Sequence, residues 1–296
     1  MRLSVTLALL VLGATAGAAI FGTVNGGPPR EQAVFFLRIG ERLALSSQEN
    51  GRAQAVTWFQ IEPELRAYDN LPGGNASPAA IRYRRSPAES KPSKQLTLCF
   101  TDPGTRYYCA GPVVPATFTE SQPIHRKFAG RIVQVVARAG DDYVDFLGEL
   151  LGTPFIMGPA VVPSGWHQTD QRVGSDCAAF ATYGRRRMGE PIFYGGPAGI
   201  VRDLRLLARS EFVASANDGV YRDHAGRRCP VGRNELRPGD VIHFGPQVSV
   251  FYSDRGVRGF LDAEDLLFQS WRATPHITSL RSSGFFNRPI HVYRWR

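Results

Sequence analysis

The sequence predicts an α+β protein, in which a small all-β region precedes a domain of helices packed on an antiparallel sheet or half-barrel. Residues 31–138 alternate apolar segments with clusters of Gly, Pro, Ser and Asn, which is typical of short strands joined by turns. Apolar residues at helical spacing mark residues 141–152, the segment at 174–189 and residues 201–212, and strand-like segments return after residue 236. Helices followed by strands indicate the α+β class. The 296 residues are enough for both domains, and we place the second at residues 141–296.

The first 22 residues, MRLSVTLALLVLGATAGAAIFG, have the composition of a secretory signal peptide. Arg2 precedes an apolar run, and small residues suited to cleavage follow at positions 14–16 and 16–18. We therefore expect a signal peptide over residues 1–22 and an exported, periplasmic or extracellular protein. The alternative is an uncleaved N-terminal anchor, because the apolar run is nearly long enough to span a bilayer. No later segment has the length and apolar character of a transmembrane span.

Six segments account for the strands predicted in the first domain. The fourth and fifth are separated by a turn at residues 102–104, which predicts a hairpin with Cys99 opposite Cys109. Export implies an oxidising compartment, so we expect a disulfide between them, worth roughly 3 kcal/mol for so short a loop. The other two cysteines, Cys177 and Cys229, offer a second possible pair beside this one. The six segments are residues 33–39, 53–62, 79–85, 95–100, 106–111 and 130–140.

Charge and residue spacing limit the expected partners. The formal net charge is +9, which favours non-specific attraction to anionic surfaces. The basic residues are scattered and form no aromatic-basic motif, so no specific nucleic-acid partner is expected. Cysteines and histidines are scattered as well, and no glycine-rich phosphate loop follows a strand. The sequence thus predicts neither a metal site nor a cofactor.

Three helices are predicted ahead of the final strands. Apolar residues at helical spacing mark residues 141–152 and 201–212. Between them, Ser175 is the expected N-cap of a helix whose last turn carries three arginines and which ends before Gly189. Beyond them, two strands are expected around the turn at residues 244–246. The later strand segments are residues 265–271, 276–280 and 290–296.

Cys177 occupies the first turn of the middle helix. The positive end of the helix dipole lowers the pKa of a thiol and favours the thiolate, which is a nucleophile. Two structural alternatives are a small buried residue that packs the start of the helix, and a disulfide to Cys229.

Four segments give residues 141–296 a resemblance to the NlpC-type cell-wall endopeptidases of the papain-like cysteine peptidase superfamily. GSDCAAFATYGRRRMG is similar to the nucleophile helix of that family, and LRPGDVIHF to the turn that enters its first barrel strand. ELLGTPFIMGP and QVSVFY resemble two further family segments. The resemblance implies a thiol protease that cleaves an amide bond in a peptidoglycan stem peptide. It implies Cys177 as the nucleophile, and Gln171, six residues upstream, as an oxyanion-stabilising amide.

The sequence departs from the family where the proton-transfer partner is expected. Gln247 stands at the position of the family's general-base histidine, and an amide cannot accept and return a proton. Gln269 is the nearest match to the third polar residue, and Phe155 replaces a supporting tyrosine. His243, four residues before Gln247, is the candidate base. The alternative is that His243 is a strand residue bonded to a backbone carbonyl or to solvent.

Three functions remain open at this point. The first is an exported cysteine hydrolase that uses Cys177 and His243, assisted by Gln171, Gln247 and Gln269. The second is an inactive member of the family that binds a cell-wall peptide or a protein in a cleft lined by Gln247, Gln269 and Trp166, with His167 nearby. The third is hydrolysis or acyl transfer at a non-peptide ester or amide. A histidine within hydrogen-bond reach of the Cys177 sulfur separates the enzymes from the binding module. The residues named for these functions, with the predicted disulfide, are Cys177, His243, Gln171, Gln247, Gln269, Phe155, Trp166, His167, Cys99 and Cys109.

Overall fold

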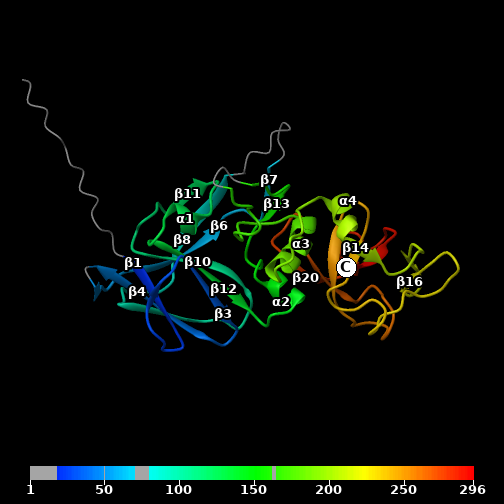
Figure 1. Cartoon of the computed structure of the whole chain (residues 1–296), viewed down its shortest axis with the longest axis horizontal. Coiled ribbons are helices and arrows are strands. Elements are labelled where there is room, and N and C mark those ends of the chain that lie inside the picture. Colours follow the sequence, from blue (N-terminus) through cyan, green and yellow to red (C-terminus); the bar gives the residue numbers. More distant parts are fainter. Residues whose placement is uncertain (1–18, 50, 71–79, 162–164) are drawn as a thin grey trace, which may run out of the picture.

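Strands dominate the computed structural model, which describes residues 19–49, 51–70, 80–161 and 165–296. Two sheets lie at one end of the molecule and a third sheet at the other, with helices α2 and α3 between them (Figure 1). Within the described residues, α3 (Cys177–Arg187) is the longest helix, with 11 residues. The others have four to six residues: α1 (Ile124–Lys127), α2 (Tyr143–Gly148) and α4 (Pro197–Ile200). The predicted α+β, papain-like class is therefore wrong, because the molecule consists mostly of sheets.

Two of the three predicted helices are shortened or replaced. Helix α2 stops at Gly148, and Gly152 soon follows with a left-handed φ of +82°. Residues 201–212 form a 3-10 turn, η2 (Val201–Asp203), and then strand β14 (Leu204–Leu206), which pairs antiparallel with β21 (His291–Trp295). Leu204 is buried while the next two residues are exposed. Pairing with a sheet edge thus outweighs the weak local helical pattern.

The first domain contains two sheets packed face to face. The first has the order β2-β1-β4-β5, with β9 also paired to β4, and the second has the order β11-β8-β6-β10-β12-β3. All six predicted strand segments appear as strands (β3, β6, β8, β9, β10 and β12). The described bounds are β1 (Ala19–Val24), β2 (Arg30–Glu31), β3 (Val34–Arg38), β4 (Arg42–Glu49), β5 (Arg52–Ala53), β6 (Trp58–Pro63), β8 (Ile81–Pro87), β9 (Gln95–Cys99), β10 (Gly104–Ala110), β11 (Thr117–Glu120) and β12 (Ile132–Arg138).

A single core lies between these two sheets. Leu43 and Leu45 of β4 are fully buried against Trp58 of β6 and Val135 of β12. Residues 1–18 of the predicted signal peptide lie outside the described residues, whereas residues 19–22 belong to β1, in which Ile20 is buried. No described helix is long and apolar enough to cross a membrane.

The predicted disulfide between Cys99 and Cys109 is absent, and all four cysteines are free thiols. Cys99 is exposed on β9, which pairs with β4 in the first sheet, whereas Cys109 is buried on β10, which pairs with β6 and β12 in the second. The turn at residues 102–104 therefore carries the chain from one sheet to the other instead of folding it back as a hairpin. The hairpin prediction was wrong because local turn signals do not specify which sheet the next strand joins.

The C-terminal sheet has the order β14-β21-β17-β18-β19-β20. Helices α2 and α3 cover one face, and Gly184 of α3 lets Tyr143 of α2 pack so closely that a side chain at Gly184 would collide with it. A second apolar cluster covers the other face, and β15 (Val213–Ala214) pairs with β16 (Tyr221–Arg222) beside it. The predicted strands around the turn at residues 244–246 are confirmed. The remaining bounds are β17 (Val241–His243), β18 (Val248–Ser253), β19 (Leu266–Gln269), β20 (His276–Ser279) and η3 (Arg281–Ser283).

The two halves of the chain share backbone and side-chain hydrogen bonds. Strand β13 (Phe155–Met157) pairs in parallel with β7 (Ala67–Asp69). The Tyr107 hydroxyl donates to the carbonyl of Arg172 at 3.2 Å, and Gln134 Nε2 donates to the carbonyl of Gln171 at 3.0 Å. The C-terminal site is therefore built against the N-terminal sheets.

Candidate functional site

The N-terminus of α3 positions Cys177. Asp176 is the N-cap, and its carboxylate accepts from the backbone N–H of Ala179 at 2.8 Å. The predicted cap, Ser175, instead lies one residue outside the helix, where its carbonyl accepts from Ser270 Oγ at 2.9 Å. The predicted end of the helix is confirmed, because Gly189 follows the C-cap with a left-handed φ of +93°.

The thiol of Cys177 is protonated at neutral pH. Cys177 is only 5% exposed. Burial, with a smaller contribution from the negative charge of Asp176, raises the pKa of its thiol to about 12. The backbone N–H groups of Val248 and Ala178 act in the opposite direction but do not offset burial. The expected lowering of the thiol pKa was therefore wrong, because desolvation outweighs the helix dipole here. Cys177 lies on the face of the sheet opposite Cys229, and both are free.

His243 is engaged at both ring nitrogens by backbone groups. Nδ1 accepts from the N–H of Gly245 at 3.0 Å, and Nε2 lies 3.0 Å from the carbonyl of Pro197, which it must contact as an N–H donor. Burial lowers the pKa of His243, while the bond to Pro197 raises it only partly back. The ring thus has no free lone pair for a proton from Cys177, and the geometry matches the alternative of a strand histidine bonded to a carbonyl.

Gln247 directly precedes β18 and its first residue, Val248, whose backbone N–H contacts the Cys177 thiol. The residue is completely buried, and within the described part of the chain neither Nε2 nor Oε1 of its carboxamide has a hydrogen-bond partner. The Oγ of Ser175, also completely buried, likewise has no partner there. An unsatisfied buried polar group costs about 1–3 kcal/mol. The region around Cys177 therefore contains uncompensated hydrogen-bonding capacity.

Both ends of the Gln269 carboxamide are hydrogen-bonded within the C-terminal half. Its Oε1 accepts from Ser249 Oγ at 3.2 Å, and its Nε2 donates to the carbonyl of Ser283 at 3.4 Å. These bonds join β18, β19 and the 3-10 turn η3. The side chain therefore holds the sheet together and orients no histidine.

Gln171 and Trp166 face the N-terminal half instead of the thiol. Gln171 Oε1 accepts from Arg126 Nε at 2.8 Å, and the Arg126 guanidinium stacks 3.8 Å above the ring of Trp166, which is 40% exposed. His167 stacks on Tyr194 at 3.8 Å, and burial lowers the pKa of His167 to about 4. Gln171, Trp166 and His167 therefore do not join Cys177 in one site.

A row of aromatic rings leads from Phe155 to the apolar cluster on the face of the C-terminal sheet opposite Cys177. Phe155 forms a parallel β-bridge with Ser175, and its ring packs edge-on against Trp271. The ring of Phe285 packs against Trp271 on one side and Phe244 on the other. Phe244 donates its N–H to the carbonyl of Gln247 at 2.8 Å. The sequence analysis missed Trp271, although it lies in the apolar segment that contains Gln269.

Comparison with known proteins finds no matching family model, no matching curated protein and no matching solved structure. Among the described residues, no group of three or more His, Cys, Asp or Glu side chains is arranged to hold a metal ion. The chemistry must therefore be judged from the side chains themselves. A protonated thiol, a neutral amide and a histidine bonded elsewhere supply no nucleophile and base pair, whereas the amide has a donor and an acceptor free for a ligand.

Proposed function

We propose that the chain is an exported, non-catalytic module that binds cell-wall peptides in its C-terminal half. The observation that carries this proposal is the fully buried carboxamide of Gln247, which has no hydrogen-bond partner among the described residues and belongs to the residue directly before Val248, whose N–H contacts the Cys177 thiol. The four segments that resemble NlpC-type endopeptidases support a peptidoglycan-related ligand. The net charge of +9 supports attraction to anionic wall polymers.

A peptide group suits Gln247 because a primary carboxamide donates and accepts hydrogen bonds, as a backbone amide does. Binding would satisfy a donor and an acceptor that now have no partner in the described chain. Because Gln247 is completely buried, binding of a peptide requires the chain around its carboxamide to open.

The test combines sedimentation with purified peptidoglycan and measurement of soluble peptide released from it. The parent protein and Cys177→Ser should sediment equally and release nothing, because the thiol does no chemistry. Gln247→Leu should sediment about tenfold more weakly, since it loses both hydrogen bonds of the amide. Gln54→Leu is the matched control, because Gln54 is an exposed glutamine in the other half of the chain.

Two outcomes would overturn the proposal in different ways. Release of soluble peptide that disappears in Cys177→Ser would make the protein a hydrolase. Failure of the parent protein to sediment with peptidoglycan would exclude a cell-wall peptide as the ligand.

A further inference from the structure

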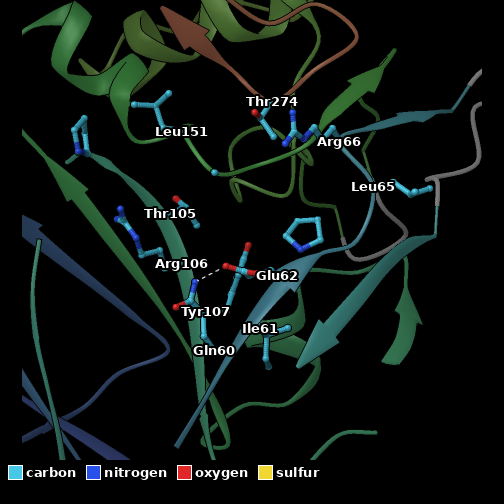
Figure 2. A pocket seen from close by; sticks show the side chains of 13 residues that line it. Gln60, Ile61, Glu62, Leu65, Arg66, Thr105, Arg106, Tyr107, Leu151 and Thr274 are labelled. Atoms are coloured by element: carbon cyan, nitrogen blue, oxygen red, sulfur yellow. Dashed lines mark hydrogen bonds between the residues drawn. The ribbon is translucent and has the colours of Figure 1, made fainter. Parts of the chain in front are cut away.

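His125 of α1 lies at the junction of the two halves. It is completely buried, and its ring stacks on Tyr107 of β10 with 6.3 Å between the ring centroids. Figure 2 shows Tyr107 beside a cavity of about 260 Å³ that residues of both halves line. The hydroxyl of this tyrosine donates to the carbonyl of Arg172, so the histidine packs against a side chain that joins the halves.

The surroundings of the His125 ring oppose a positive charge. Neither ring nitrogen has a hydrogen-bond partner among the described residues. Burial, together with the charges of Arg172 and Arg126, lowers the pKa of His125 to about 3, although the Gln171 side chain acts in the opposite direction. Burial also raises the pKa of Tyr107 to about 12, so the phenol stays neutral. The histidine is therefore a neutral ring between two guanidinium groups.

The segment that carries Arg172 is held in a strained conformation. Arg172 has a left-handed φ of +54°, which a residue with a side chain keeps only when its surroundings impose it. Its Nη2 donates to Gln134 Oε1 at 3.0 Å, and Gln134 Nε2 donates to the carbonyl of Gln171 at 3.0 Å. Arg126 Nε adds a bond to Gln171 Oε1 at 2.8 Å. Release of these contacts would relieve the strain in residues 170–173.

We propose that His125 is an acid-sensitive latch between the two halves. The closed junction offers a charged imidazole two guanidinium groups and no acceptor, so the ring takes a proton from solvent only when residues 170–173 move away. Their release gives the ring access to water and frees the backbone of Arg172. No part of this step involves Gln247, so the inference is independent of the function proposed above.

Acid acts on the latch in a defined pH range. The folded-state pKa of about 3 lies below the ordinary value of 6.5, so the closed junction is at full strength above pH 6.5 and weakens as the pH falls toward about 3. One proton shifts the equilibrium about tenfold for each pH unit in this range. Burial also lowers the pKa of His167, to about 4, and that of His243. The experiment must therefore assign the proton to one histidine.

The experiment is hydrogen exchange of the full chain between pH 6.5 and pH 4.5, with each rate divided by that of the unfolded peptide at the same pH. The N–H groups of Arg172 and Val173, which bond to carbonyls of residues 169 and 168, should lose protection about fiftyfold. His125→Phe keeps a ring that does not titrate and should show no such loss. The matched control is His276→Phe, at a half-buried histidine of the C-terminal half, which should behave as the parent.

A second variant places a carboxylate beside the ring. Gln171→Glu should stabilise the charged imidazole in the closed junction and raise protection at pH 4.5 at least about tenfold above the parent. If thermal melting shows that His125→Phe does not fold, Gln171→Glu decides the test, and unchanged protection in it would overturn the latch.

Three further results would contradict the inference. The first is a parent protein whose protection at residues 170–173 does not depend on pH. The second is an equal loss of protection in β18, which would show global unfolding by acid. The third is a loss of the pH dependence in His167→Phe while His125→Phe retains it, which would assign the proton to His167.

Discussion

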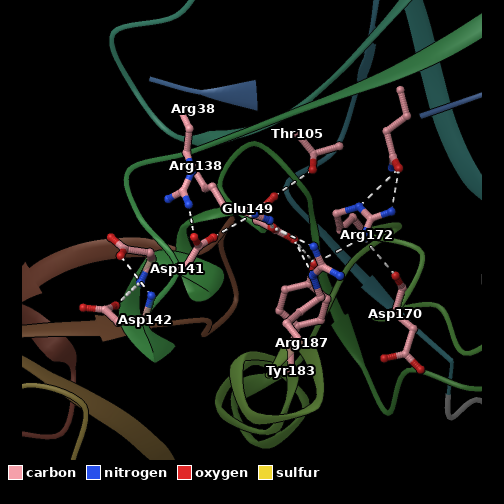
Figure 3. Close-up of polar contacts among 12 residues, drawn as sticks. Arg38, Thr105, Arg138, Asp141, Asp142, Glu149, Asp170, Arg172, Tyr183 and Arg187 are labelled. Carbon is pink, nitrogen blue, oxygen red and sulfur yellow. Dashed lines mark hydrogen bonds and ion pairs between the residues drawn. The ribbon is translucent and has the colours of Figure 1, made fainter. Parts of the chain in front are cut away.

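Glu149 and Gln247 are both completely buried, yet their surroundings differ in every respect that matters for stability. Glu149, at the junction of the halves, lies 3.0 Å from Arg138 Nη1 and 2.9 Å from Arg187 Nε, and it accepts from the Tyr183 hydroxyl (Figure 3). Gln247 has no partner for either end of its carboxamide in the described chain. One buried polar group is therefore fully satisfied, and the other is left unsatisfied.

The difference separates a structural network from a candidate binding site. Burial alone would raise the pKa of Glu149, but the hydrogen bonds from Arg187 and Tyr183 outweigh it and lower that pKa below its ordinary value. Nearly all buried polar groups in folded proteins have partners, so an unpaired one calls for a ligand or another reason to exist. The comparison thus distinguishes Gln247 from Glu149 by the partners that the Gln247 carboxamide lacks among the described residues.

Removing the charge at Glu149 should have the largest effect. In Glu149→Gln, Arg138 and Arg187 lose their buried counter-charge, and the free energy of unfolding should fall by about 3–5 kcal/mol. Urea unfolding followed by circular dichroism measures this loss. The control is Glu264→Gln, which breaks an exposed pair with Arg281 and should cost less than about 1 kcal/mol. Equal losses in the two variants would show that the network contributes no more than a surface pair.

The same network should make the protein sensitive to acid. Because the folded-state pKa of Glu149 lies below its unfolded value, its contribution to stability is fully present above about 4.5 and disappears as the pH falls through the folded-state pKa. Glu149→Gln should remove that part of the acid dependence. Unfolding curves between pH 7 and pH 3 should therefore converge for the parent and the variant as the pH falls.

Alkylation should distinguish the exposed thiol of Cys99 from the buried thiol of Cys177. Cys99 is exposed, whereas Cys177 is buried with its pKa raised to about 12. Iodoacetamide at pH 7.5 should modify Cys177 at least roughly a hundredfold more slowly than Cys99, because the thiolate is the reactive form. Peptide mapping at timed intervals gives both rates. Preferential labelling of Cys177 would restore the nucleophile interpretation.

Replacing Gln269 and Gln247 should change the free energy of unfolding differently, because only the Gln269 amide has hydrogen-bond partners in the described chain. Gln269→Leu leaves Ser249 and the carbonyl of Ser283 without their bonds and should cost about 1–3 kcal/mol. Gln247→Leu removes an amide without partners and should be neutral or stabilise the protein by up to about 1 kcal/mol. Parallel urea unfolding of both variants provides the measurement. A larger loss in Gln247→Leu than in Gln269→Leu would contradict the contrast.

The smallest effect is expected at His243. Because burial lowers its pKa, the neutral ring is the folded form, and stability is lost as the pH falls through the ordinary value of 6.5. His243→Ala should flatten this shallow dependence and change the labelling rate of Cys177 less than about twofold, since no bond joins the two side chains. A strong fall in that labelling rate would reinstate His243 as the base.

Local patterns in the sequence predicted much of the secondary structure. The six strand segments of the first domain and the strands around residues 244–246 reflect apolar alternation bounded by turn residues, which acts within a few residues. The predicted α3 has its arginine-rich last turn and Gly189 as expected, because capping is also local. The predicted helix at residues 201–212 failed where β21, about 90 residues later, offers a sheet edge.

The sequence by itself determined that Gln247 cannot transfer a proton, because that is a property of the residue type alone. Only the tertiary structure decided that the Cys177 thiol is protonated, that His243 is bonded to Pro197 and that Cys99 and Cys109 belong to different sheets. The physical reason is that desolvation and hydrogen-bond partners depend on groups far away in the chain. The residues of α3 predict a helix with Cys177 in its first turn, and hence a helix dipole at its thiol. They do not show the packing that buries the thiol.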